Sequence, residues 1–313
     1  MNMTQKIAAV SSVTLALTLS FAIVQTPSAF GQQPAGDKQA KGGLGKKDPR
    51  VQQRTYHFED TNTEMPYALF VSSKVTKDKK APLIVALHGL GGDGNSLLRG
   101  NALDLAEEGG YILVGPMGFN TEGWYGSPVI VMGGGGRGNG PGGAKGTAPG
   151  APGAAKGPGA AKGPGGPPPT PDPPNLAELS EKDVMNVLAL VRKEFTVDPQ
   201  RTYLMGHSMG GAGALYLGVK HVDQWAAVAA MAPAAFLMQP DSLAPVKDRM
   251  PLYLAHGDAD TVVPTDVGRR WAKTATGLKM RDFHYFEIPG ADHGTVITQA
   301  MPEIFKYFGQ HTK

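Results

Sequence analysis

The stretch Arg201–Leu217 reads Arg-Thr-Tyr-Leu-Met-Gly-His-Ser-Met-Gly-Gly-Ala-Gly-Ala-Leu-Tyr-Leu. Its apolar beginning is typical of a buried strand, and its end, rich in small residues, favours a helix. Between them lies a G-x-S-x-G pentapeptide, the pattern of a sharp turn that exposes a serine at the edge of a sheet. The serine of such a turn has a strained backbone, so its neighbours must be small. We therefore interpret Ser208 as the candidate nucleophile.

Strand and helix patterns alternate on both sides of this turn. Polar and apolar residues alternate at 54–59 and 65–71, which predicts an antiparallel hairpin at a sheet edge. Alternation of buried strands with helices predicts an α/β fold, with a mostly parallel sheet covered by helices on both faces. The further strands are expected at 81–87, 111–114, 226–231, 252–255 and 283–288, and the further helices at 102–106, 181–195, 267–273 and 301–308.

Polar clusters follow the last two predicted strands. His256-Gly-Asp-Ala-Asp follows residues 252–255, and a loop with His293 follows residues 283–288. Because the carboxyl ends of parallel strands meet at one edge of the sheet, we expect Ser208, Asp260 and His293 to lie together. A serine hydroxyl needs an imidazole to take its proton and a carboxylate to orient that imidazole. These three residues form the candidate catalytic triad.

Other residues near these loops have competing interpretations. Asp258 remains an alternative acid, although its position directly after the strand also suits a turn cap. Asp292 adjoins the histidine and is expected to stabilise its loop. We expect His88 and His256 to be buried imidazoles hydrogen-bonded to loop backbone, and His207 to point away from the nucleophile.

A tetrahedral intermediate would also need two backbone donors. We expect these to be the N–H groups of Leu90 and Met209, because one follows a strand end and the other follows the nucleophile. The loop from His88 lacks the residues of a phosphate-binding loop. Trp124 and Tyr125 are candidates for substrate binding, and loop packing is the alternative.

Both low-complexity parts of the chain fall outside the predicted core. Residues 1–31 are typical of a signal peptide, with an uncleaved membrane anchor as the alternative, and residues 32–50 are expected to form a disordered tail. The α/β domain spans 51–313 and is interrupted by a Gly/Pro/Ala/Lys-rich insertion at 133–174, which should be disordered. The insertion is either neutral or a basic element that attracts acidic polymers. These features predict a secreted or periplasmic protein without stable membrane association after cleavage.

Composition excludes several other classes. The formal net charge of +3 comes from the two low-complexity stretches, so we expect no nucleic-acid partner. The chain has no cysteine, which excludes disulfides and zinc sites of the thiolate type. We expect no metal and no cofactor.

These motifs together resemble those of α/β-hydrolases, in particular secreted esterases such as polyhydroxybutyrate depolymerases and feruloyl or acetylxylan esterases. The resemblance covers residues 51–132 and 175–313 and implies an eight-stranded sheet, a Ser-Asp-His triad and cofactor-independent ester cleavage. This chain departs from the pattern in having no disulfide near the site and in carrying the insertion. The resemblance rests on Pro82–Gly89, Gly123–Gly126, Asp183–Val187, Asp198–Gly211 and His256–Pro264.

The sequence therefore favours a secreted serine esterase that acts on small or polymeric esters, including polyesters and esters from plant polymers. A serine peptidase of the prolyl-oligopeptidase type is an alternative, because it would share the turn and the triad. A non-catalytic protein that binds a polymer or a wall is another. Fold alone does not separate these functions.

Overall fold

The computed structural model describes residues 47–128 and 172–313. The predicted signal peptide and nearly all of the predicted tail and insertion lie outside these ranges. At the described end of the tail, the Arg50 guanidinium forms an ion pair with Asp104 at 2.8 Å. At the end of the insertion, Asp172 accepts a hydrogen bond of 3.0 Å from the side chain of Asn120.

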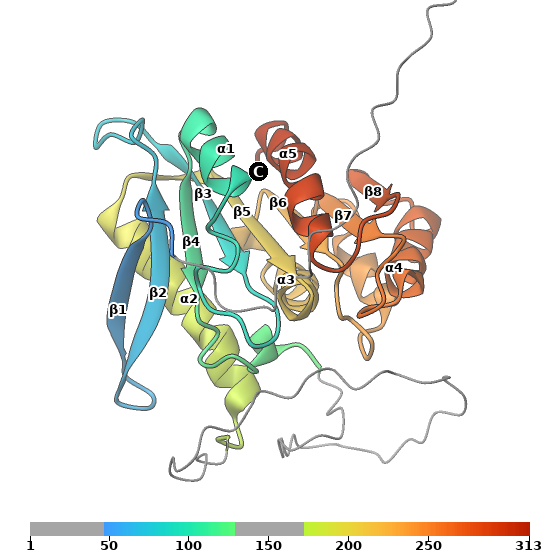
Figure 1. Cartoon of the computed structure of the whole chain (residues 1–313), viewed down its shortest axis with the longest axis horizontal. Coiled ribbons are helices and arrows are strands. Elements are labelled where there is room, and N and C mark those ends of the chain that lie inside the picture. The colour runs from blue at the N-terminus through green and yellow to red at the C-terminus, as the bar shows by residue number, and fades with distance from the viewer. Residues whose placement is uncertain (1–46, 129–171) are drawn as a thin grey trace, which may run out of the picture. The chain divides into compact units, whose positions relative to one another are not determined.

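The fold centres on one sheet of eight strands in the order β1-β2-β4-β3-β5-β6-β7-β8. The strands β3 to β8 pair in parallel, whereas β2 pairs antiparallel with both β1 and β4. The predicted hairpin thus lies at one edge of the sheet (Figure 1). The strands are β1 (Gln52–Phe58), β2 (Thr63–Val71), β3 (Ala81–Leu87), β4 (Ile112–Pro116), β5 (Val197–His207), β6 (Ala227–Met231), β7 (Leu252–Gly257) and β8 (Phe283–Ile288).

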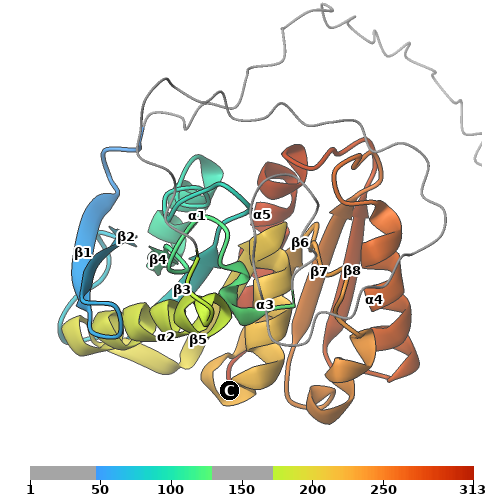
Figure 2. The same ribbon diagram turned by 90° about the horizontal axis from the view of Figure 1, so that it is seen from below.

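Helices cover both faces of the sheet, as Figure 2 shows. The five α-helices of the described chain are α1 (Asn101–Gly109), α2 (Leu176–Glu194), α3 (Met209–Lys220), α4 (Thr265–Gly277) and α5 (Thr295–Gly309). Short 3-10 turns occur at η1 (Trp124–Gly126), η2 (Val222–Gln224) and η3 (Pro240–Val246). The predicted eight-stranded, mostly parallel sheet with helices on both faces is confirmed.

Alternation along the buried strands explains the two layers of core. In β3, Leu83, Val85 and Leu87 belong to the core layer that also contains apolar residues of α2, α3 and α4. Ile84 and Ala86 point to the opposite face and belong to the core layer that contains apolar residues of α1 and α5. Because successive side chains of a strand face opposite sides, a continuous apolar run fits a sheet that is buried on both faces.

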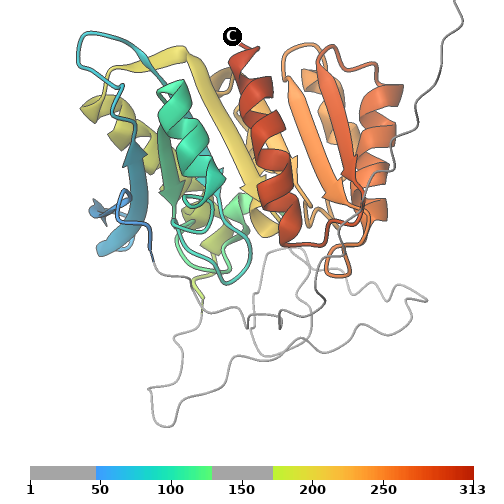
Figure 3. The same ribbon diagram turned by 45° about the horizontal axis from the view of Figure 1, so that its top comes forward.

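The topology places two loops together at the centre of the sheet. From β3 the chain continues to β4 on one side and later to β5 on the other, so β3 and β5 are neighbours at a switch point. Loops diverge at such a point and leave a crevice at the carboxyl ends of the strands. The strands run toward this edge in Figure 3, and the serine turn follows β5 there.

Some boundaries differ from the sequence-based expectation. The strand β5 begins at Val197 and continues through Asp198-Pro199, where we expected a break. The pairing between β3 and β5 shifts register in this region, so the missing N–H of Pro199 removes no ladder hydrogen bond. The helices α2 and α5 both begin earlier than their apolar periodicity predicts. No helix in the described ranges has the length and apolarity needed to cross a membrane.

Candidate active site

The turn at Ser208 has the strained geometry that its sequence predicts. Ser208 has φ 57° and ψ −116°, an unfavourable conformation for a residue with a Cβ. A Cβ on Gly206 would overlap the carbonyl oxygen of Gly210, and a Cβ on Gly210 would overlap the carbonyl oxygen of Leu87, so both positions require glycine. The N–H of Ser208 donates to the carbonyl of Met231 at 2.9 Å, and the Ser208 carbonyl accepts from Ala234 at 2.9 Å. Neighbouring backbone therefore fixes the serine at the sheet edge.

Three side chains from three loops form a continuous hydrogen-bonded chain. Nε2 of His293 lies 2.9 Å from Oγ of Ser208, and Nδ1 of His293 lies 2.7 Å from Oδ2 of Asp260. With the proton on Nδ1, the imidazole donates to the carboxylate and accepts the serine proton through Nε2. The structure thus brings together the three residues that the sequence proposed as a triad.

The environment of Asp260 keeps its carboxylate ionised. Burial by itself would raise the pKa of this group, but hydrogen bonds from His256, from His293 and from the N–H of Val263 outweigh burial and lower the pKa. Its Oδ1 accepts the N–H groups of Val262 at 2.8 Å and Val263 at 2.9 Å. These two bonds fix the orientation of the carboxylate and leave Oδ2 facing His293 and His256.

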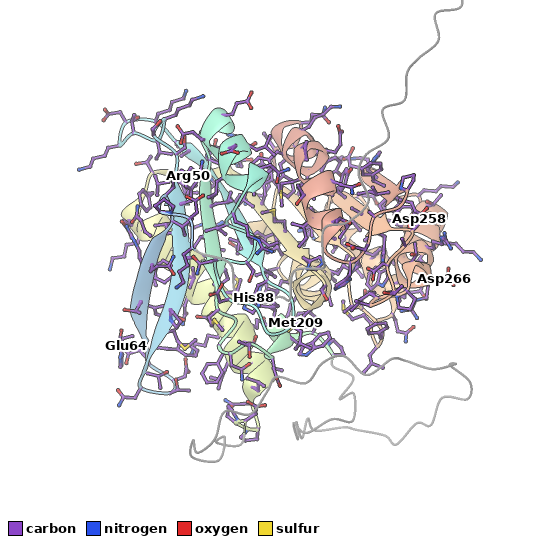
Figure 4. All side chains as sticks on the ribbon, viewed as in Figure 1. Arg50, Glu64, His88, Met209, Asp258 and Asp266 are labelled. Carbon is purple, nitrogen blue, oxygen red and sulfur yellow. The ribbon has the colours of Figure 1, made fainter. Side chains whose placement is uncertain are left out.

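Asp258 does not reach the histidine. Its Oδ1 instead accepts the N–H of Gly290 at 2.6 Å on the exposed side of the loop. Figure 4 labels Asp258 on the β7 side of the molecule, and it labels His88 and Met209 where β3 and α3 meet. The choice of acid that the sequence left open is therefore decided by geometry in favour of Asp260.

The loop that carries His293 is held by two further contacts. Asp292 and Thr295 form two reciprocal hydrogen bonds in the turn that leads into α5: the N–H of Thr295 donates to Asp292 Oδ1 at 2.7 Å, and the N–H of Asp292 donates to Thr295 Oγ1 at 2.9 Å. Nε2 of His207 donates to the carbonyl of His293 at 2.7 Å. The imidazole of His293 is therefore fixed through its own backbone.

The side chain of His207 lies closer to His293 than we expected from the sequence. We expected its side chain to point away, but its ring centroid lies 4.6 Å from that of His293. Burial and the neighbouring His293 lower the pKa of His207 to about 3. A neutral His207 adds no positive charge beside His293 when that imidazole takes a proton. The G-x-S-x-G pattern carries no signal for this contact, because it depends on a loop 86 residues away.

The two predicted backbone donors lie next to the serine. Met209 is the first residue of α3, so its N–H has no acceptor within that helix. Leu90 follows Gly89, on which an added Cβ would lie 3.3 Å from Cβ of Ser208. The next N–H groups of this loop are used within the fold, since Gly91 donates to Thr121 and Gly92 donates to Gly89. The N–H of Leu90 has no such acceptor in the described part of the chain.

Tyr125, which we predicted as a substrate-binding candidate, is buried in the core. It is 0% exposed, and its hydroxyl donates to the carbonyl of His88 at 3.2 Å. The side-chain oxygen of Ser180 accepts its N–H at 2.9 Å. Tyr125 therefore supports the loop after β3 from within the core and does not face a substrate. Its neighbour Trp124 is partly buried against the same core, which is the packing alternative.

The remaining histidines beside the site contact loop backbone. The ring nitrogens of His88 lie 2.8 Å from the carbonyl of Gly89 and 2.9 Å from that of Met117. His256 donates from Nε2 to the carbonyl of Val263 at 2.9 Å, and the same nitrogen lies 3.4 Å from Asp260. Neither histidine belongs to a cluster of metal-ligating groups within residues 47–128 and 172–313.

Comparison with known proteins agrees with this architecture. Residues 184–284, which include the serine turn and Asp260, match the model of the esterase family described as "Putative esterase". The structure also matches the CE1 ferulic acid esterase of the anaerobic fungus Anaeromyces mucronatus with a TM-score of 0.58. This match has 20% identity and covers 88% of this chain and 96% of the fungal enzyme. The chain has the α/β-hydrolase fold.

Curated relatives of this α/β-hydrolase match over shorter stretches. The acyl-protein thioesterase 1 of Emericella nidulans is 29% identical over 111 residues, which are 33% of this chain and 45% of the relative. The S-formylglutathione hydrolase of Bos taurus is 50% identical over 44 residues, which are 14% of this chain and 16% of the relative. The matches thus span less than half the length of these relatives.

Proposed function

We propose that this α/β-hydrolase cleaves carboxylic esters through an acyl-enzyme on Ser208. The observation that carries the proposal is the hydrogen-bonded chain from Ser208 through His293 to Asp260, at 2.9 Å and 2.7 Å. The match to the esterase family model supports the same reaction class. Hydrogen-bond geometry of this kind activates a hydroxyl that is otherwise a poor nucleophile.

Each proposed step uses a group already described. Oγ of Ser208 attacks the carbonyl carbon of the ester while its proton passes to Nε2 of His293. The N–H groups of Leu90 and Met209 stabilise the negative charge that develops on the carbonyl oxygen. Collapse of the intermediate releases the alcohol with the proton from His293 and leaves the acyl group on Ser208. Water then attacks by the same route and releases the carboxylic acid.

Covalent labelling tests this mechanism directly. A fluorophosphonate probe should label the wild-type protein and should not label Ser208→Ala. Ser242→Ala is the matched control, because the buried hydroxyl of Ser242 has no hydrogen-bond partner among residues 47–128 and 172–313 and takes no part in the site. Label on the Ser208→Ala protein at the wild-type level would refute the assignment of the nucleophile.

Thioester hydrolysis is the second candidate, because curated relatives are named as a thioesterase and an S-formylglutathione hydrolase. The same acyl-enzyme could form from either substrate class. A panel of p-nitrophenyl esters, feruloyl esters, polyester film, acyl thioesters and aminoacyl amides separates the candidates by kcat/KM. Preference for the amides would favour the peptidase alternative, and the absence of all turnover would favour a binding protein.

We also propose that the protein is exported with removal of a signal peptide ending near residue 31. This proposal rests on the apolar run Ile7–Val24 and the small residues that follow it. N-terminal sequencing of the exported protein is the test. An N-terminus at Met1 would contradict cleavage and favour the membrane-anchor alternative.

A further inference from the structure

Three large apolar side chains are exposed in the described part of the chain. Leu90, Leu237 and Val262 are 60%, 48% and 63% exposed, whereas the hydrophobic residues of the two cores are buried. Single exposed aliphatic residues are ordinary on protein surfaces, but a group of them at one place indicates a binding site. Whether these three side chains form a binding site therefore depends on where they lie in the fold.

All three lie in loops at the same edge of the sheet. Leu90 follows β3, Leu237 follows β6 and Val262 follows β7, each at the carboxyl end of a parallel strand. Ser208 follows β5, which lies between β3 and β6 in the sheet. The three side chains thus come from loops on both sides of the nucleophile.

Backbone contacts tie each of these loops to the catalytic groups. In the loop after β3, Gly89 approaches Ser208 so closely that an added Cβ would lie 3.3 Å from the serine Cβ. In the loop after β6, Ala234 donates its N–H to the Ser208 carbonyl at 2.9 Å. In the loop after β7, Val262 itself donates to Asp260 at 2.8 Å. Each exposed side chain is therefore within a few residues of a contact to the triad.

In the loops after β6 and β7, a buried apolar residue lies directly beside the exposed one. Val263 is 1% exposed, although its neighbour Val262 is 63% exposed. Met238 is 7% exposed, next to Leu237 at 48%. One side chain of each pair is anchored in the protein, so the loops hold their exposed neighbours in place without burying them.

We propose that Leu90, Leu237 and Val262 form an apolar rim that binds the hydrocarbon part of the ester substrate. This inference rests on the proposed function and adds a substrate class: esters with an aliphatic or aromatic group of several carbons beside the scissile bond. Removing apolar surface from water provides the affinity, and full burial contributes roughly fourfold per methylene. The three side chains act beside the reacting atoms and take no part in proton transfer.

The test compares two series of esters. The first varies the acyl group from acetate to hexanoate with p-nitrophenol as the constant alcohol, and the second varies the alcohol from methyl to hexyl with a constant acetyl group. The variant is Leu237→Ser with Val262→Thr, which leaves the backbone donor at Leu90 intact. Val75→Thr is the control, because Val75 lies in the loop before β3 at the opposite edge of the sheet.

In at least one series, wild-type kcat/KM should rise about tenfold or more from the shortest to the longest group, as burial of part of the chain predicts. The double variant should reduce this ratio about tenfold, and Val75→Thr should preserve it. The rim proposal alone is overturned if the double variant still reacts with a fluorophosphonate but changes the ratio of kcat/KM between the longest and shortest groups by less than about twofold in both series. No label and no ester turnover in the wild type overturns the proposed function and the rim together.

Discussion

Substitution of Asp260 by asparagine should change the tautomer of His293 while the site stays assembled. Oδ1 of Asp260 accepts two backbone N–H groups, so the asparagine oxygen should keep this position. The amide NH₂ would then face Nδ1 of His293, which the carboxylate now contacts at 2.7 Å. Two donors cannot face each other, so the imidazole should move its proton to Nε2. In that tautomer Nε2 cannot accept the proton of Ser208.

The expected loss in kcat/KM is about 10⁴-fold, the size of effect known for such a tautomer change in a serine protease, or about 5 kcal/mol of transition-state stabilisation. The assay is hydrolysis of p-nitrophenyl acetate at pH 7 to 8. Asp258→Asn is the matched control and should retain most activity, because Asp258 accepts the N–H of Gly290 and does not contact His293. A loss below about tenfold in Asp260→Asn, or an equal loss in Asp258→Asn, would refute this account of the acid.

Three further predictions concern stability and substrate contact. Because the pKa of His207 is about 3 in the fold and about 6.5 when unfolded, the folded state binds fewer protons, and stability should fall as pH drops from about 6.5 by up to ~1.4 kcal/mol per unit. His207→Gln should flatten this slope in urea unfolding between pH 6.5 and 4.5, and an unchanged slope would contradict the low pKa. Gly206→Ala should destabilise the fold by about 3 kcal/mol through overlap with Gly210, whereas Gly277→Ala, where a Cβ meets nothing within 4 Å, should be neutral or slightly stabilising in the same assay. Tyr125→Phe should cost about 1 kcal/mol of stability and leave KM unchanged; a higher KM at full stability would return Tyr125 to the substrate site.

Local patterns were sufficient for most elements of the fold. Apolar runs such as residues 81–87 predicted strands buried on both faces, because the side chains on both faces of such a strand must be apolar. Element ends were less predictable. The helix α5 begins at Thr295, directly after a turn held by hydrogen bonds between Asp292 and Thr295, whereas apolar periodicity becomes clear only near Met301.

The sequence likewise predicted some features of the candidate site and left others open. Ser208 and the glycines around it were evident from the sequence, because the strained turn requires small residues at fixed spacing. His293 was evident from its place after the last strand. The choice between Asp258 and Asp260 required the structure. The two carboxylates are two residues apart, and only the conformation of their loop decides which one meets His293.

The sequence by itself thus determined the order of strands and helices, the strained serine and the set of residues from which a triad could form. These follow from periodicity and local backbone restrictions, which act within a few residues. Only the tertiary structure decided that Asp260 accepts from His293, that His207 donates to the His293 carbonyl and that Tyr125 is buried beneath the loop after β3. Each of these contacts joins segments distant in the chain, so its geometry depends on how the strands pair and how the loops pack across the sheet edge.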